Sequence, residues 1–299
     1  MKISSEKLIQ LFTILLIISL TCILINNLII NINRTGLGFN FKWLFQPAGF
    51  ALADAPLSYS PSDSYAWALF MGWINSLKII TGSLLLATFI GVFVGLARVG
   101  KNKLLNLVSA TYITLIRQIP LLLQLLFWYF VGFLGLKTNV ISPFGNIFRI
   151  SNQGLNIYGL QISPEFLALL IGLSVFTGAY IAEVVRGGIN SVPLGQWEAF
   201  RSLGLSDRTG LYTVIIPQAL PAILPGLTSQ YLNLAKNSTL AIAIGFADIY
   251  AINDTIITQT GRSIEGFIIL LLSFLFLNLI ISYGMEFFNS SILNSRKNY

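Results

Sequence analysis

The 299-residue sequence contains no histidine and a single cysteine, Cys22, which lies in its first apolar run. These absences exclude histidine-based proton relays, zinc sites, Ser-His-Asp triads and disulfide bonds within the chain. Charge is also scarce, because Asp, Glu, Lys and Arg make up only 10% of the residues, against roughly 25% in soluble domains. A water-soluble enzyme is therefore excluded, since too few charges are available to cover its surface.

The sequence is instead rich in apolar runs. Hydrophobic residues make up 55% of the chain, and several predominantly apolar stretches are long enough to cross a bilayer as helices. These stretches cover residues 8–30, 69–97, 108–136, 165–186, 212–252 and 266–288. They do not alternate between polar and apolar residues, as transmembrane β-strands do. We therefore predict an all-α, polytopic membrane protein with about six transmembrane helices.

The fifth run, 212–252, is too long for one ordinary span. Three prolines, Pro217, Pro221 and Pro225, precede a polar sequence at 236–239. We predict one crossing built from a proline-rich helix, a break within the membrane and a second short helix; two short spans are the alternative. Such a break requires protein or a water-filled cavity to satisfy the freed backbone groups.

The distribution of charge predicts the orientation. Ten basic and three acidic residues lie in one set of segments: the N-terminus, Arg186, 98–107, 187–211 and the C-terminal tail. Five basic and five acidic residues lie in the other set: 31–68, 137–164, Glu165 and 253–265. Because basic residues concentrate on the cytoplasmic side of membrane proteins, we predict that both termini are cytoplasmic. Splitting the fifth run would place the basic C-terminal tail outside.

Two glycine motifs end the second run. Residues 95–102 nearly match the phosphate-binding pattern G-x-x-x-x-G-K-[ST], but Asn102 lacks the hydroxyl that binds Mg²⁺. The match also ends a membrane helix instead of joining a strand to a helix. If the protein uses ATP, another chain must therefore bind it. Gly91 and Gly95 permit close helix contact, either in general packing or in a dimer interface.

The segment 187–216 is the longest predicted cytoplasmic loop, and it is not simply polar. After Pro193, helical spacing places Leu194, Trp197, Phe200 and Leu203 on roughly one face. Such a short amphipathic helix could rest on lipid headgroups, or it could dock into a groove on a soluble partner.

The same segment resembles the EAA motif of ABC importer permeases. That motif reads E-A-A, three residues, G, nine residues, I-x-L-P. Here Glu198-Ala199, Gly204 and Val214-x-Ile216-Pro217 follow it with the same spacing. The departures are Phe200, Val214 and Ile216, and all three remain apolar.

Further segments are similar to permeases of the polar amino-acid family, and some to its general L-amino-acid subgroup. They are Gln46–Phe50, Arg117–Gln124, Ala179–Ile189 and Tyr231–Gly245. Many other members have Asp where Asn237 stands. The similarity covers roughly residues 40–290 and is highly specific for the family.

The resemblance implies a type I ABC importer permease fold with a cytoplasmic coupling helix, in a bacterial plasma (inner) membrane. Two permeases, this chain with a paralogue or a second copy, would form the pathway through the lipid bilayer. ATPase subunits would bind ATP and Mg²⁺, and an extracytoplasmic binding protein would deliver the amino acid. This chain would be a non-catalytic subunit with no bound cofactor, metal or nucleic acid. The residues expected to couple to the ATPase are Leu194, Trp197, Glu198, Ala199, Phe200, Gly204 and Pro217.

Charged or polar groups within membrane spans are functional hypotheses by default. The polar sequence Lys236, Asn237, Ser238 and Thr239 is a candidate substrate pathway, since broken helices present donors and carbonyls to substrates. The alternative is that Lys236 pairs with an acid such as Glu183 and only stabilises the bundle. Arg117, near Pro120, is expected to form a structural or gating pair with Glu183, with direct substrate contact as the alternative.

We predict three regions and one function. Residues 1–68 form an uncleaved signal-anchor span and an outer loop, 69–290 the permease transmembrane domain with its EAA-like loop at 187–217, and 291–299 a cytoplasmic tail. The predicted function is import of polar or general L-amino acids. The alternative is a stand-alone secondary transporter, which usually carries internal repeats, and we find no repeat.

Overall fold

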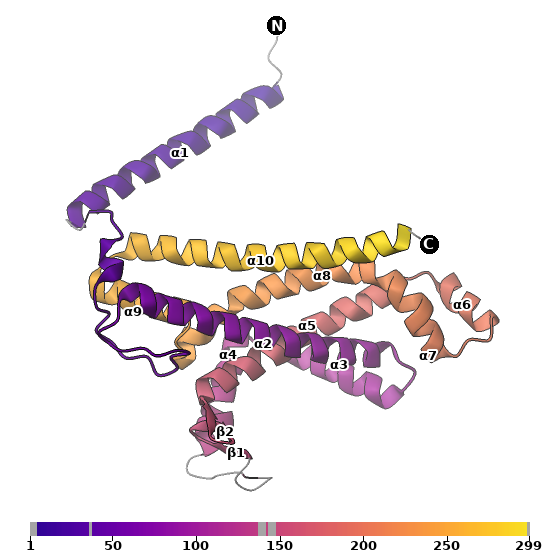
Figure 1. The fold of residues 1–299 in the computed structure, drawn as a ribbon. Coiled ribbons are helices and arrows are strands. Elements are labelled where there is room, and N and C mark those ends of the chain that lie inside the picture. The colour runs from indigo at the N-terminus through magenta and orange to yellow at the C-terminus, as the bar shows by residue number, and fades with distance from the viewer. Residues whose placement is uncertain (1–4, 36–37, 137–141, 143–147, 298–299) are drawn as a thin grey trace.

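The computed structural model describes residues 5–35, 38–136, 142 and 148–297. Helices dominate it, and a small three-stranded sheet lies below them at the bottom of the view (Figure 1). The longer helices are α1 Ser5–Thr35, α2 Tyr65–Val99, α3 Lys103–Gln118, α5 Pro164–Asn190, α8 Ile216–Asn237, α9 Ile249–Thr260 and α10 Ser263–Lys297. The shorter helices are η1 Lys42–Phe45, α4 Leu121–Leu126, η2 Phe127–Phe133, η3 Leu134–Leu136, α6 Leu194–Ser202, α7 Asp207–Gly210, η5 Leu211–Ile215 and η6 Ser238–Ile244. The strands are β1 Phe148–Ser151, β2 Gly154–Ile157 and β3 Leu160–Ile162.

Five helical segments are long and apolar enough to cross a membrane, and a sixth span arises if the bent segment 103–136 is counted as one. The bend, 104° between its two halves, falls at Pro120, which cannot continue a helix. The buried Gln124 amide donates to the carbonyls of Ile116 and Ile119, each at 2.9 Å, and so satisfies backbone groups that the bend frees. The predicted number of spans is therefore confirmed.

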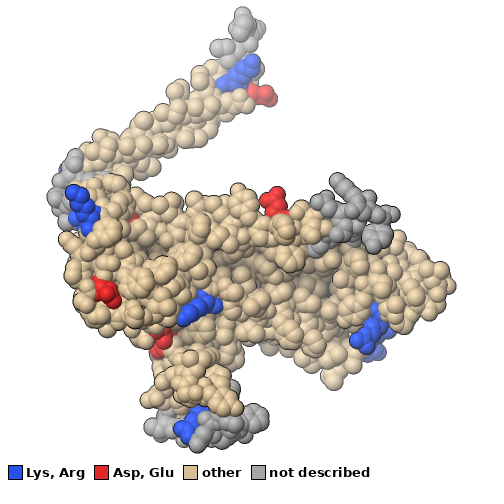
Figure 2. Space-filling view, in the orientation of Figure 1, with Lys and Arg blue, Asp and Glu red and all other residues tan. Residues whose placement is uncertain are grey.

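The helical bundle is held by α2, α5, α8 and α10, which pack in sequence against one another. Helix α1 stands apart from them (Figure 1). Its most apolar stretch is not buried by any other part of the described chain. On the face shown in Figure 2, charged side chains are sparse and most of the surface belongs to other residue types. A surface of this kind suits contact with lipid.

Two glycines let α2 approach α5 closely. A Cβ at Gly91 would lie 2.4 Å from Ile181 Cγ2, and one at Gly95 would lie 2.8 Å from the Ala182 carbonyl oxygen. Of the two alternatives for this motif, the structure therefore supports packing within the chain.

The fifth apolar run contains one candidate span, Asp207–Ile244, so the helix tightens at the polar sequence 236–239 and the break predicted there falls after it, at 245–248. Helix α8 continues through Pro221 and Pro225, which lie inside it, and ends at Asn237. The 3₁₀ helix η6 follows and ends at Gly245 with φ +78°, a left-handed conformation that glycine adopts readily. Helix α9 then begins after Asp248, whose carboxylate accepts a hydrogen bond from the Ala251 amide at 2.8 Å.

The predicted outer segment 137–164 holds a small sheet that we did not expect. Strands β1, β2 and β3 form an antiparallel meander, with Phe148 opposite Ile157 and Leu155 opposite Ile162. Tyr158 and Gly159, both with positive φ, make the two-residue turn between β2 and β3, as tight hairpins require. Strands this short carry no apolar run of the length that predicts an element in this sequence.

Residues 38–64 of the predicted outer segment 31–68 meet residues 253–265 at one end of the bundle, which we name the outer end after that prediction. Trp43 and Ala48 are buried there against Tyr65 of α2 and Ile249 of α9. At the start of α10 a buried ion pair joins Arg262 Nη1 to Glu265 Oε1 at 2.9 Å. Arg262 also donates to the Gly38 carbonyl at 3.2 Å. The opposite end is formed by 98–107 and 187–211, and we name it the coupling end after the role predicted for the EAA-like segment.

Candidate functional site

The coupling end presents a short, well-terminated helix, α6. It begins after Pro193, whose fixed φ suits a helix start. At its other end the Gly204 amide donates to the Arg201 carbonyl at 2.9 Å, and the Leu205 amide donates to the Phe200 carbonyl at 3.1 Å. With Gly204 at φ +75°, these bonds form a Schellman motif. The glycine of the EAA-like pattern therefore has a conformational role, because it ends the helix.

The four residues predicted to form one apolar face of α6 differ in how exposed they are. Leu194 and Leu203, at its two ends, are 77% and 78% exposed, whereas Phe200 is only 1% exposed and Trp197 is half-buried. Phe200 therefore cannot enter a groove on a partner, as the sequence pattern suggested, because its ring already packs inside this chain. The predicted contact residues that remain accessible on the helix are Leu194, Glu198 and Ala199.

Phe200 is instead the anchor of the coupling helix. A Cβ at Gly210 of α7 would lie 2.2 Å from the Phe200 ring, so the ring rests directly on that glycine's backbone. Gln218, the neighbour of the half-buried Pro217, donates to the Gln196 side chain at 3.0 Å. The ring therefore packs α6 against α7, and one exposed hydrogen bond links α6 to the start of α8.

An exposed ion-pair cluster adds a second attachment. The Asp207 carboxylate pairs with Arg201 of α6 at 3.0 Å and with Lys101 of the segment between α2 and α3. The Arg201 guanidinium also lies 5.5 Å from the centre of the Phe200 ring. Three separate segments therefore meet beside α6.

A cavity of about 260 Å³, with both polar and aromatic side chains in its wall, lies beside the end of α8. Of the four predicted pathway residues, Lys236 and Asn237 line it. Ser238 and Thr239 do not; their hydroxyls donate to the Ala235 and Lys236 carbonyls at 2.9 and 2.8 Å. These two residues satisfy the end of the helix instead.

A second cavity of about 370 Å³ adjoins the first, and the two share Tyr180 of α5. Arg117 and Glu183 both line it, but they do not pair with each other. The Glu183 carboxylate accepts from Arg186 at 2.7 Å, and the Arg117 guanidinium lies 4.9 Å from the centre of the Tyr180 ring. The expected pair is therefore replaced by a local ion pair and a cation–π contact.

Several cavity residues escaped the sequence analysis. Gln230 and Asn233 line the first cavity with Lys236 and Asn237, at spacings of three and four that share one helix face. That spacing could have identified them. Phe176, Thr177 and Tyr180 of α5 also line it, and only the packing of α5 on α8 brings them there.

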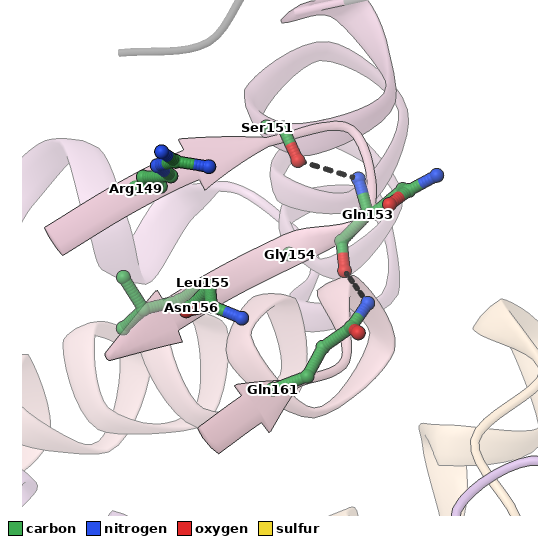
Figure 3. A pocket seen from close by; sticks show the side chains of 7 residues that line it. All are labelled: Arg149, Ser151, Gln153, Gly154, Leu155, Asn156 and Gln161. Carbon is green, nitrogen blue, oxygen red and sulfur yellow. Dashed lines mark hydrogen bonds between the residues drawn. The ribbon is translucent and has the colours of Figure 1, made fainter. Parts of the chain in front are cut away.

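Another cavity, of about 390 Å³, lies on the meander (Figure 3). Gln161 of β3 donates to the Gln153 carbonyl at 3.3 Å, and the Ser151 hydroxyl accepts from the Gln153 amide at 3.2 Å. None of the residues predicted for coupling or transport lies here.

Residues 87–294 match the family described as the binding-protein-dependent transport system inner membrane component. The chain belongs to this family. The fold is therefore that of an ABC importer permease, and the alternative of a stand-alone secondary transporter is not supported.

Individual proteins that are similar to this chain support the same family assignment. The putative amino-acid ABC transporter permease YhdX of Escherichia coli K12 is 32% identical, over 95% of this chain and 93% of its own length. The general L-amino acid transport system permease AapQ of Rhizobium johnstonii is 31% identical, over 95% and 91%. A crystal structure of an amino acid ABC transporter matches with a TM-score of 0.61 and 32% identity, over 76% of this chain and 95% of the other.

Proposed function

We propose that this chain is the transmembrane subunit of an ATP-driven importer for polar or general L-amino acids, in a bacterial inner membrane. The observation that carries the proposal is α6, whose exposed ends Leu194 and Leu203 flank a helix anchored from within by Phe200. This arrangement supplies an accessible apolar contact and a buried attachment to α7, which leads into α8 through η5. A helix that only rested on lipid headgroups would not need such an anchor.

The proposed assembly has several members. ATPase subunits receive α6 and bind ATP and Mg²⁺, so this chain itself is non-catalytic. A second permease, a paralogue or another copy of this chain, completes the pathway, and an extracytoplasmic binding protein delivers the substrate. Both termini lie in the cytoplasm, in accord with the basic residues of the coupling end.

The cavities beside α5 and α8 are the proposed substrate path. In the first, the Lys236 ammonium and the amides of Gln230, Asn233 and Asn237 can meet a substrate carboxylate and its polar groups. Lys236 is the single formally charged residue among those lining it. In the second, Arg117 and Glu183 supply both signs of charge. Tyr180 separates the two and acts as the gate residue.

The test is uptake of a panel of labelled amino acids into membrane vesicles that contain the complete importer. The neighbouring ATPase, permease and binding-protein genes are co-expressed, and ATP is placed inside. Uptake that requires both ATP and the binding protein supports the proposal and identifies the substrates. Uptake driven by an ion gradient without ATP would refute it.

The substrate path is tested by Asn237→Leu, which removes a polar group from the first cavity while keeping a similar size. Uptake is expected to fall or to become restricted to fewer amino acids, with ATPase association unchanged. Ser238→Ala is the control, because its hydroxyl bonds to the helix and not into the cavity. An unchanged uptake profile for Asn237→Leu would place the substrate elsewhere.

A further inference from the structure

The outer end contains a cavity that the transport path described above does not include. Its volume is about 440 Å³, within the ~300–1,000 Å³ range of small-molecule sites. Its walls come from the loop 53–56, from α2, from the junction of β3 with α5, and from Phe246 in the turn before α9. Four separate parts of the chain therefore converge on it.

The cavity presents one charge of each sign. Asp54 of the loop and Lys78 of α2 both line it and attract each other electrostatically. Among the described residues, however, no ion pair within 4.0 Å joins them. The Phe166 and Phe246 rings, 5.8 Å apart, add an aromatic wall. An ammonium group, a carboxylate and a side chain can each find a complementary surface there.

The acidic wall is held firmly in place. Asn75 Nδ2 donates to the Asp54 carbonyl at 2.8 Å and to the Ala247 carbonyl at 2.9 Å. One buried amide thus ties the loop to α2 and to the turn before α9. Ser163, whose hydroxyl accepts from the Phe166 amide at 3.2 Å, lies beside the Asp54 carboxylate. Sites that bind small molecules are typically preorganised by such supporting hydrogen bonds.

The cavity is aligned with the proposed substrate path along α5. Phe166 lines it, Thr177 and Tyr180 line the first transport cavity, and Glu183 lines the second. At 100° per residue these side chains occupy about a third of the helix circumference, and they span about 25 Å of its length. The three cavities therefore follow one face of α5 from the outer end towards the coupling end.

We propose that the outer cavity is a binding site for the α-amino and α-carboxylate groups of a free amino acid. Asp54 receives the ammonium group, Lys78 receives the carboxylate, and the side chain lies against Phe166 and Phe246. This proposal rests on the proposed import of amino acids and adds a first site on the route to the deeper cavities.

The test measures protection of a cysteine placed in the cavity wall. Ala53 lines the cavity and is exposed, so Ala53→Cys is introduced after Cys22→Ser removes the native thiol. The assembled importer, in nanodiscs and without binding protein, is labelled with a membrane-impermeant maleimide. A mixture of the twenty L-amino acids is expected to slow labelling several-fold. Their N-acetylated derivatives and methyl esters, which lack one of the two charges, are expected not to.

Two further variants test whether Asp54 and Lys78 are each needed for protection. Asp54→Asn and Lys78→Gln, each added to Ala53→Cys, are expected to abolish protection. Asp63→Asn and Lys42→Gln are matched controls, since both residues lie in the same outer segment and neither lines the cavity. Protection that is absent in the parent, or that survives both Asp54→Asn and Lys78→Gln, would overturn the proposal.

Uptake into vesicles separates this proposal from the importer function. If ATP-dependent uptake occurs and protection does not, the outer site fails and the importer stands. If uptake fails and protection by free amino acids is present, the outer site stands and the proposed function fails.

Acidification provides a second readout. Burial raises the pKa of Asp54, the nearby Glu165 carboxylate raises it further, and the Ser163 hydroxyl and the Lys78 ammonium oppose the rise. The carboxylate is therefore neutralised at a higher pH than an ordinary aspartate. The ratio of labelling rates with and without amino acids is expected to approach one as the pH falls. A ratio that stays constant down to the ordinary pKa of 3.8 would contradict a role for Asp54.

Discussion

The two ends of the molecule are held together by different physical means. At the outer end, buried groups join the segments: Asn75 bonds to the loop and to the turn before α9, and the Arg262 and Glu265 side chains are only 14% and 7% exposed. At the coupling end, one buried ring, Phe200, secures α6. The other attachments there are exposed, with Lys101 77% and Asp207 40% accessible.

This difference indicates which end of the permease is rigid and which end can adjust. Buried polar contacts are costly to break, so the outer end is expected to move as one unit. Exposed ion pairs contribute little and exchange readily with water. The coupling end is therefore expected to adjust its polar contacts while the Phe200 ring stays packed on Gly210 of α7.

The largest effect is expected from Phe200→Ala. Removing a buried aromatic side chain destabilises its surroundings by about 3–5 kcal/mol, which should detach α6 from α7. We expect ATP hydrolysis to continue and uptake per ATP to collapse. Limited proteolysis should then cut the segment 187–217 faster. The control is Leu107→Ala, an exposed position on α3, and uptake per ATP equal to wild type would refute the anchor.

The next largest effect is expected from Glu265→Ala. The variant removes the carboxylate that faces a buried guanidinium, which typically destabilises a protein by about 3 kcal/mol. Thermal unfolding in detergent should shift to lower temperature. The double variant Arg262→Met/Glu265→Leu removes both charges and should recover much of the loss. Equal melting of the single variant and wild type would show that the outer end is not held by this pair.

A smaller effect is expected from Gly204→Asp. A Cβ at this position meets no atom within 4 Å, so the backbone penalty comes from φ +75° and amounts to about 1–2 kcal/mol. The carboxylate adds a charge in the turn that we propose faces the ATPase, and uptake per ATP should fall. Gly204→Asn is the matched control, because Asn tolerates this conformation and carries no charge. Equal coupling in the two variants would exclude the charge as the cause.

The sequence predicted those parts of the site that depend on local pattern. Amphipathic spacing located α6, and the polar sequence 236–239 marked the end of α8. It could not predict that Phe200 faces inward, because Gly210, on which the ring rests, lies in another helix. The burial of Ser238 follows from bonding to its own helix, which a list of polar residues does not reveal.

The partner of each charged residue was harder to predict from the sequence than its place in the fold. Glu183 had two basic candidates, and it bonds to Arg186, three residues away on the same helix. Arg117 instead contacts Tyr180. The meander was missed because its strands are three or four residues long, too short to produce a recognisable periodicity.

The smallest effect is expected from Asp207→Asn, which removes both exposed ion pairs beside α6 and leaves Phe200 in place. Because such pairs are weak and are screened by salt, thermal unfolding should be unchanged. Uptake per ATP should fall slightly at low ionic strength and return to the wild-type value at high salt. Lys101→Gln should behave in the same way, since Asp207 pairs with both Lys101 and Arg201. A loss as large as that of Phe200→Ala, insensitive to salt, would mean that Asp207 is the anchor and that both ends are rigidly held.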